Sequence, residues 1–266
     1  MEQFEKDYAA LIDKVLDYGE RRETRNQSTL SVFGTSIEFD LRKGFPLLSG
    51  RKMFPDGVLG ELAALLRQPK CVQDFKDWGC NYWGTWADEN GQLNLDYGNA
   101  WFDFEGFDQI ADLKDKLKND PSNRRMIINA WRPHKLGDLS LPCCHYSYQF
   151  HVSTTGVISM VWTQRSVDTM VGMPSDFVLA GAWLIAVAAE FGFTPGRVKM
   201  DFGDTHIYTD HIEGANQYLK QCDDVVLARV TWSYATKGED FCEFEPAKLR
   251  LGHYTPQPAI KFKLHG

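Results

Sequence analysis

One cysteine and one arginine near the middle of the chain have the types and spacing of a nucleophilic site. Residues 145–152 alternate in the period of a strand, residues 153–156 form a turn signal, and residues 157–163 form a second apolar strand. If the hairpin turns between Thr154 and Thr155, antiparallel pairing brings Cys144 and Arg165 together. A neighbouring cation favours the thiolate, so the spacing predicts a nucleophile at Cys144. The alternative is a small buried cysteine and a solvated arginine.

The elements that must position this hairpin are helices and strands mixed along the chain. Apolar spacing predicts helices over residues 4–18, 57–66, 107–118, 177–191 and 210–218, with Glu61 on the second of them. Strands are predicted over residues 29–41, 198–200 and 225–232. No repeat, low-complexity tract or linker divides the sequence. The chain is therefore expected to form one α+β domain over residues 1–266, with a central mixed sheet flanked by helices.

Composition limits the classes of function. Of the 266 residues 43% are hydrophobic, which suffices for a sizeable core, and the formal net charge is -7. That charge argues against a general nucleic-acid surface, although one phosphate pocket remains compatible with it. The six cysteines lack the spacing of a zinc site or a disulfide scaffold. With no signal sequence and no uncharged apolar run of membrane-spanning length, we expect a reduced, cytoplasmic protein without a metal or a membrane partner.

Several collinear segments resemble the motifs of thymidylate synthases. The central pair is Leu141-Pro142-Cys143-Cys144-His145 followed by Gln164-Arg165-Ser166-Val167-Asp168. The others are Thr29 to Gly34, Trp86 to Gly91, Asn119 to Arg125, Gly172-Met173-Pro174 and Gly203 to Tyr208. The resemblance runs in order along nearly the whole chain. It implies a thymidylate-synthase-like fold and one-carbon transfer from 5,10-methylenetetrahydrofolate to a pyrimidine nucleoside monophosphate.

The resemblance assigns the catalytic groups. Cys144 matches the nucleophile that adds to carbon 6 of the pyrimidine, which makes carbon 5 able to attack an electrophilic methylene. Glu61 matches the carboxylate that organises proton transfer and water; its alternative is a solvated helix residue. Tyr97 matches a tyrosine near the nucleophile.

The resemblance also assigns the phosphate-binding set. Arg165, Ser166, Arg124 and Arg125 match residues that hold the nucleotide phosphate, for which forked guanidinium donors are well suited. In the family the pair Arg124 and Arg125 reaches into the neighbouring subunit, which implies a homodimer. Taken alone, that pair would more often be solvated. Arg25 is assigned a further phosphate contact, although the local pattern departs from the family there.

The remaining assignments concern the sugar and the folate. His206 and Tyr208 match the residues that hold the 3'-hydroxyl. The residues that match the folate side are Trp83, Trp86, Leu141, Asp168 and Gly172, with Asp168 on the pterin.

Asp176 departs from the thymidylate synthases, which carry asparagine at this position. An asparagine can accept from ring nitrogen 3 of uracil and donate to the carbonyl at position 4, whereas a carboxylate offers acceptors only. Cytosine instead presents a donating amine at position 4. Aspartate is also what the related deoxycytidylate hydroxymethylases carry here, so we expect Asp176 to be catalytic and to bind a cytosine ring. The alternative is that Asp176 caps the helix that follows.

The fate of the transferred carbon depends on whether water reaches it. Ser175 stands where phenylalanine is usual, and the chain ends in His265-Gly266 where synthases end on a small apolar residue. Both changes suit a wetter pocket, so we expect a hydroxymethyl product. The alternatives are a dCMP methyltransferase, a hydroxymethylase acting on CMP, a thymidylate synthase that tolerates Asp176, and a non-catalytic RNA-binding regulator. Viral DNA modification, in a host cytoplasm, and nucleoside-antibiotic synthesis both fit such an enzyme.

Overall fold

A six-stranded mixed sheet forms the centre of the computed structural model, which describes residues 2–223 and 229–265. Strands β5 and β6 are parallel, and the other neighbouring pairs are antiparallel. Across the sheet the strands are β1 (Glu20–Arg22), β2 (Thr29–Asp40), β6 (Thr194–Tyr208), β5 (Val157–Asp168), β4 (His145–Val152) and β3 (Ile127–Asn129). A separate hairpin pairs β7 (Thr231–Tyr234) with β8 (Leu249–Gly252). The predicted α+β class with a central mixed sheet is confirmed.

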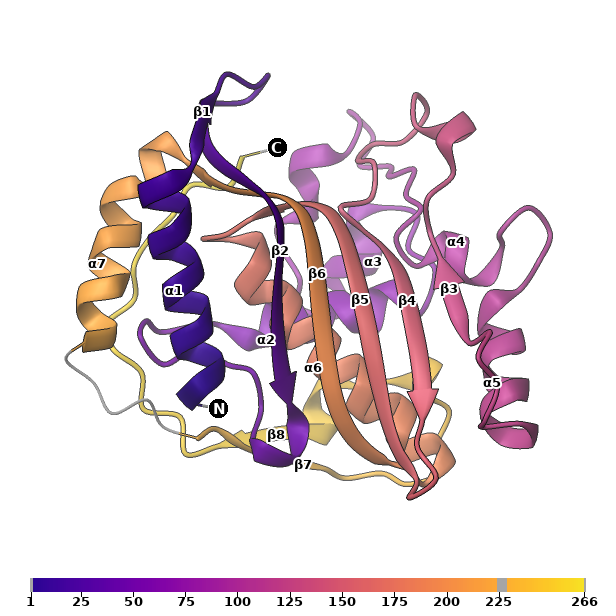
Figure 1. The fold of residues 1–266 in the computed structure, drawn as a ribbon. Coiled ribbons are helices and arrows are strands. Elements are labelled where there is room, and N and C mark those ends of the chain that lie inside the picture. Colours follow the sequence, from indigo (N-terminus) through magenta and orange to yellow (C-terminus); the bar gives the residue numbers. More distant parts are fainter. Residues whose placement is uncertain (1, 224–228, 266) are drawn as a thin grey trace.

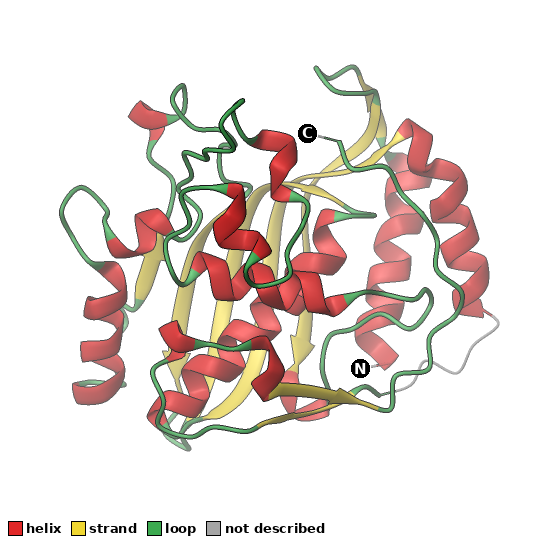
Figure 2. Cartoon of the chain, turned by 180° about the vertical axis from the view of Figure 1, so that it is seen from behind, coloured by secondary structure: helices red, strands yellow, loops and turns green. Residues whose placement is uncertain are grey.

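Helices cover one face of this sheet. Helices α2 and α6 pack behind the strands in Figure 1 and in front of them in Figure 2, while α1 runs beside β2 and contacts α7. The α-helices are α1 (Glu2–Tyr18), α2 (Pro55–Leu65), α3 (Val72–Lys76), α4 (Asn99–Phe102), α5 (Gln109–Asn119), α6 (Gly172–Phe191) and α7 (Ile212–Asp223). The predicted helices at residues 4–18, 57–66 and 107–118 correspond to α1, α2 and α5.

An irregularity in the β4–β5 hairpin sets the position of the predicted nucleophile. From Ser147 to the turn the hairpin keeps one register, in which Cys144 would lie opposite Ser166. The pairing shifts by one residue between His145 and Ser147. Arg165 therefore lies opposite Cys144, and its backbone N–H donates to the Cys144 carbonyl at 2.9 Å. The predicted pairing of the two residues is confirmed.

Helix α6 begins earlier than the sequence indicates. It starts at Gly172 rather than at residue 177, because Asp168 Oδ1 accepts from the N–H groups of Met170 and Val171 just before the helix. Asp176 is thus the fifth residue of α6, and the prediction that it caps the helix is wrong. The length and hydropathy of α6 would also suit a membrane span, but 78% of its most apolar window is buried inside the protein, as in a core helix.

The C-terminal third differs from expectation in its extents. The strand predicted at residues 198–200 is only part of β6, which is long because it bonds β2 on one side and β5 on the other. The strand predicted at residues 225–232 lies partly outside the described residues, and β7 begins at Thr231. The helix predicted from residue 210 begins as a 3-10 turn, Thr209–His211, before α7.

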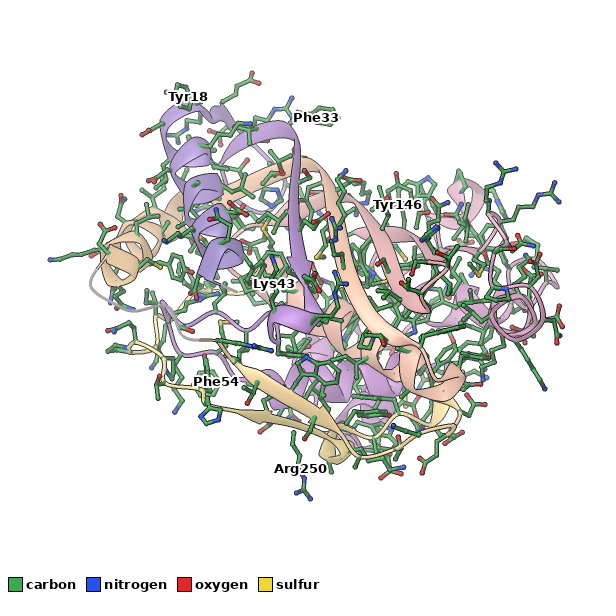
Figure 3. All side chains as sticks on the ribbon, turned by 60° about the horizontal axis from the view of Figure 1, so that its bottom comes forward. Tyr18, Phe33, Lys43, Phe54, Tyr146 and Arg250 are labelled. Atoms are coloured by element: carbon green, nitrogen blue, oxygen red, sulfur yellow. The ribbon has the colours of Figure 1, made fainter. Side chains whose placement is uncertain are left out.

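Within residues 2–223 and 229–265, no helix lies over the opposite face of the sheet (Figure 1). The side chains there are largely polar, and Lys199 forms an ion pair with Asp201 at 2.7 Å along β6. Beside them Phe33, at the periphery of the view in Figure 3, is 84% exposed. An antiparallel sheet can keep one face polar and exposed to solvent, as this face is. Because no described element covers it, a partner could also pack there.

Candidate active site

A single cavity of about 710 Å³ collects almost every residue that the sequence singles out. It lies where the ends of β5 and β6 meet the start of α6, and α2 and the C-terminal segment complete its walls. The predicted residues that line it are Arg25, Glu61, Trp83, Trp86, Tyr97, Leu141, Cys144, Arg165, Ser166, Asp168, Gly172, Asp176, His206 and Tyr208. Its size falls within the range of small-molecule sites in proteins.

Arg124 and Arg125 do not line this cavity. Both are exposed, in the loop between α5 and β3, where the N–H of Arg125 donates to the Asn123 side chain at 2.8 Å. The site of a single chain therefore lacks the two arginines that the resemblance assigns to a neighbouring subunit.

Cys144 is held by polar contacts from two directions. Its backbone N–H donates to the Tyr97 hydroxyl, and its Sγ lies 3.8 Å from Arg165 Nη2. Burial raises the pKa of the Cys144 thiol, and the Arg165 guanidinium and the Tyr97 hydroxyl oppose that rise. Arg165 favours the thiolate as predicted, but burial remains the larger effect.

Arg165 also holds the turn that carries the thiol. Its Nε donates to the Cys143 carbonyl at 2.8 Å, and its Nη2 donates to the Pro142 carbonyl at 3.0 Å. These two hydrogen bonds fix the backbone before Cys144 relative to the guanidinium. Arg165 thus combines positioning with its predicted contact to phosphate.

Glu61 sits in a pocket of aromatic donors. The Tyr82 hydroxyl donates to Oε2 at 2.6 Å and the Trp83 indole donates to Oε1 at 2.8 Å. Burial raises the pKa of Glu61 to about 7, and the two donors counteract it. A carboxyl with a pKa near neutrality can both release and take up a proton, as an acid–base group must. Trp83, predicted on the folate wall, is 4% exposed and contacts the carboxylate.

Asp176 projects from α6 into the same cavity. Its Oδ2 accepts from Gln164 Nε2 at 2.9 Å. Burial raises the pKa of Asp176 well above its usual range; the Gln164 donor opposes this, while the charges of Glu61 and Asp168 add to it. Two carboxyls with raised pKa values on one cavity are typical of a catalytic site rather than of a solvated surface.

The C-terminal segment lies against the end of the cavity at Tyr208. The ring of His265 contacts Tyr208, with centroids 4.2 Å apart, and its Nε2 lies 3.0 Å from an oxygen of Asp210. Further back, the Phe262 ring contacts the Arg51 guanidinium at 4.7 Å. His265 is therefore held in contacts rather than free, unlike the loosened end that the sequence suggests.

The side assigned to folate is mainly apolar with a few polar atoms. The rings of Trp83 and Trp86 lie 5.2 Å apart, and the buried Trp86 Nε1 has no hydrogen-bond partner. A Cβ added to Gly172 would lie 3.9 Å from Asp168 and Asp176, at ordinary contact distance. An orphaned donor beside aromatic rings suits a flat heterocycle with acceptor atoms, so these residues fit a folate.

Two residues near the reacting groups escaped the sequence reasoning. Tyr82 belongs to no recognised motif, and only its hydrogen bond to Glu61 in the structure shows that it takes part in the site. Gln164 had a signal: it adjoins Arg165 and alternates with Trp162 on the core face of β5.

The fold and the cavity bring a cysteine thiol together with two buried carboxyls of raised pKa, an arrangement typical of an enzyme site. Comparison with known families gives a match to thymidylate synthase over residues 6–265. The chain belongs to the thymidylate synthase family. Its members transfer one carbon from methylenetetrahydrofolate to carbon 5 of a pyrimidine nucleotide, and they are usually dimeric.

Proposed function

We propose that this enzyme converts dCMP to 5-hydroxymethyl-dCMP with methylenetetrahydrofolate as the carbon donor. The observation that carries the choice of cytosine is Asp176, whose carboxyl lines the cavity while its place inside α6 leaves it no capping role. An ionised carboxyl accepts from the amine at position 4 of cytosine. It has no donor for the carbonyl that uracil carries there. A buried mismatch of that kind costs about 1–3 kcal/mol.

The reaction begins with Cys144. Its thiolate forms a bond to carbon 6 of the ring, and the electron pair moves towards ring nitrogen 3, where a proton that comes from water and is shared between the nitrogen and the Asp176 carboxylate neutralises the charge. Carbon 5 is then nucleophilic, and the folate supplies the electrophilic carbon. Stabilisation at nitrogen 3 grows as charge develops, so it lowers the barrier rather than merely tightening binding.

The later steps need a base and a water molecule. The proton on carbon 5 must leave, and Glu61 is placed to take it directly or through water. Once that proton has left, the bond between the transferred carbon and the folate nitrogen breaks and tetrahydrofolate leaves. Water then adds to the resulting exocyclic methylene, and the Cys144–carbon 6 bond breaks, which leaves CH₂OH in place of hydrogen. Support for water comes from the polar edge at Ser175, whose hydroxyl donates to the Val171 carbonyl at 3.1 Å and keeps its lone pairs for other donors.

A substrate panel tests this proposal. Purified enzyme is given dCMP, CMP or dUMP with methylenetetrahydrofolate, and each product is identified by mass. We expect dCMP to gain CH₂O and tetrahydrofolate to appear. A methyl product with dihydrofolate would refute the hydroxymethyl assignment, and turnover of dUMP alone would refute the cytosine assignment. Preference for CMP would refute the deoxyribose assignment.

Catalysis itself is tested by Cys144→Ser. We expect the variant to lose measurable turnover while it still binds nucleotide. A wild type without turnover on any of the three nucleotides would favour a non-catalytic, RNA-binding protein instead.

The proposed assembly is a homodimer in a reducing cytoplasm. Supporting it are the sheet face without a helix (Figure 1), the exposed Arg124 and Arg125, and six cysteines that are all free. Arg124 and Arg125 would complete the phosphate site of the partner. Light scattering should give twice the chain mass of 30.4 kDa. Mixing Arg125→Ala chains with Cys144→Ser chains should restore about a quarter of the sites if the arginines are shared. No restoration would contradict the sharing.

A further inference from the structure

A chain of hydrogen bonds leads from the core to the carboxyl of Asp176. The Trp162 indole Nε1 lies 3.2 Å from Gln164 Oε1, and Gln164 Nε2 lies 2.9 Å from Asp176 Oδ2. Trp162 is fully buried and Gln164 is 2% exposed, so water does not compete for these groups. Trp162 and Gln164 are two residues apart on β5 and face the core together, which brings both to the side where α6 places Asp176.

The tryptophan fixes which way the amide points. An indole N–H is a donor only, so the Gln164 atom that faces it must be the carbonyl oxygen. The NH₂ group of Gln164 is then left to face Asp176. If the Gln164 amide were flipped, its carbonyl oxygen would face the Asp176 carboxyl oxygen. Its NH₂ group would then face the Trp162 N–H, so two donors would meet.

This orientation matters because an aspartic acid can imitate asparagine. A protonated carboxyl has one donor and one acceptor, and it can therefore satisfy both nitrogen 3 and the position-4 carbonyl of uracil. An ionised carboxyl has only acceptors and leaves that carbonyl unpaired. Discrimination against uracil thus requires Asp176 to remain an acceptor towards the ring.

We infer that Gln164 is a specificity-determining positioning residue. Held in one amide orientation by Trp162, it donates to Asp176 Oδ2 and favours, against burial, the acceptor form of that carboxyl, which is the form that rejects uracil. The inference rests on the proposed preference for cytosine and explains how a carboxyl buried in this cavity keeps it.

The surroundings of Asp176 make such a donor necessary. Glu61 on α2 and Asp168 at the end of β5 both disfavour its ionised form, as does burial. The thiol of Cys144 and the hydroxyl of Tyr148 also interact electrostatically with Asp176. Among the causes of its pKa shift, the hydrogen bond from Gln164 is the one that acts towards ionisation.

Two substitutions interrupt the chain at different links. Gln164→Leu removes the donor to Asp176, and Trp162→Phe removes the group that orients the amide. Trp183→Phe is a matched control, because Trp183 is equally buried and its indole Nε1 has no hydrogen-bond partner. Gln217→Leu, at an exposed position of α7, controls for loss of an amide.

The primary measurement is the ratio of kcat/KM for dCMP to kcat/KM for dUMP between pH 6 and 9. We expect Gln164→Leu to lower this ratio at least tenfold and Trp162→Phe at least threefold at pH 7, chiefly through better use of dUMP. Loss of the donor raises the pKa of Asp176, so the ratio should recover only at higher pH than in the wild type. Trp183→Phe and Gln217→Leu should leave both the ratio and its pH dependence unchanged.

A second measurement does not depend on turnover. The carboxyl band of Asp176, assigned in infrared difference spectra against Asp176→Asn, should titrate at higher pH in Trp162→Phe and Gln164→Leu than in Trp183→Phe. The wild type could prefer dCMP while neither variant changes the dCMP-to-dUMP ratio of kcat/KM or the titration of Asp176. That result would overturn the role of Gln164 and leave the proposed substrate standing. A wild type that prefers dUMP would overturn the proposed substrate, and the infrared titration would still decide whether Gln164 controls Asp176.

Discussion

Arg165 Nη2 lies 3.8 Å from the Sγ of Cys144, and the shift in the β4–β5 hairpin register is what places the two residues opposite each other. The same guanidinium holds the carbonyl of Cys143 at 2.8 Å. Charge and backbone position at the nucleophile thus depend on one side chain. Since burial raises the pKa of the thiol, the cation is needed to keep a reactive fraction of thiolate.

Arg165→Gln should therefore slow the reaction of Cys144 with iodoacetamide. Loss of the cation raises the thiol pKa further, and a rise of one unit lowers the rate at pH 7 about tenfold. Alkylation is followed by mass spectrometry of the peptide that contains residue 144 across pH 6 to 10. Arg197→Gln, on the outer face of β6, is the control. An unchanged rate profile in Arg165→Gln would show that the cation does not activate the thiol.

Glu61 should make stability depend on pH in a defined window. Burial raises its pKa from the ordinary 4.5 to about 7, so the folded state binds the proton more tightly than the unfolded state does. Its contribution to the free energy of unfolding is present in full below pH 4.5 and is lost as the pH rises to about 7. The loss amounts to about 3 kcal/mol at most.

Glu61→Gln isolates that contribution. A glutamine can still accept from Trp83, and its amide can donate to the Tyr82 hydroxyl, so the fold should persist while the titration disappears. Urea unfolding of both proteins from pH 4.5 to 8 gives the difference in free energy. We expect the wild type to lose stability relative to Glu61→Gln up to about pH 7 and not beyond. A constant difference would mean that the carboxyl has an ordinary pKa in the folded protein.

Asp176→Asn should move the preference from cytosine to uracil. The amide gains a donor for the carbonyl at position 4, and it loses one of the acceptors that a cytosine uses. We expect the ratio of kcat/KM for dCMP over dUMP to fall by a factor of about 10 to 100, since each mismatched buried hydrogen bond costs about 1–3 kcal/mol. Asp115→Asn, at an exposed position of α5, serves as the matched control. A ratio that stays constant in Asp176→Asn would remove the ring-reading role.

The sequence predicted the proximity of Cys144 and Arg165 better than it predicted the surroundings of the thiol. Hairpin spacing alone suggested that Cys144 lies opposite Arg165. The regular register would place Cys144 opposite Ser166, and the observed pairing depends on the one-residue shift between His145 and Ser147, which strand period does not record. Hairpin spacing could not reveal that burial outweighs the cation at the thiol, since desolvation depends on everything packed around a group. The start of α6 was misplaced for a related reason: the Asp168 carboxylate that precedes the helix acts through backbone N–H groups, which no periodicity records.

Contacts between distant segments were the hardest to foresee. Tyr82 contacts Glu61, and Gln164 contacts Asp176, because tertiary packing brings separate elements together. The C-terminal segment was expected to be loosened by its polar end, yet His265 is fixed by Tyr208 and Asp210.

The attachment of the C-terminal segment depends on a glycine of α7. A Cβ added to Gly214 would lie 2.5 Å from the Phe262 ring, so the glycine makes the space into which that ring packs. Gly214→Ala should displace Phe262 and with it the wall that the segment gives to the cavity. We expect KM for the folate to rise about tenfold, and KM for the nucleotide to rise as well, because His265 of the same segment contacts Tyr208. Gly137→Ala, where a Cβ meets nothing within 4 Å, is the control. Steady-state kinetics with each substrate varied in turn measures both effects, and an unchanged KM for folate in Gly214→Ala would show that the docked segment takes no part in binding it.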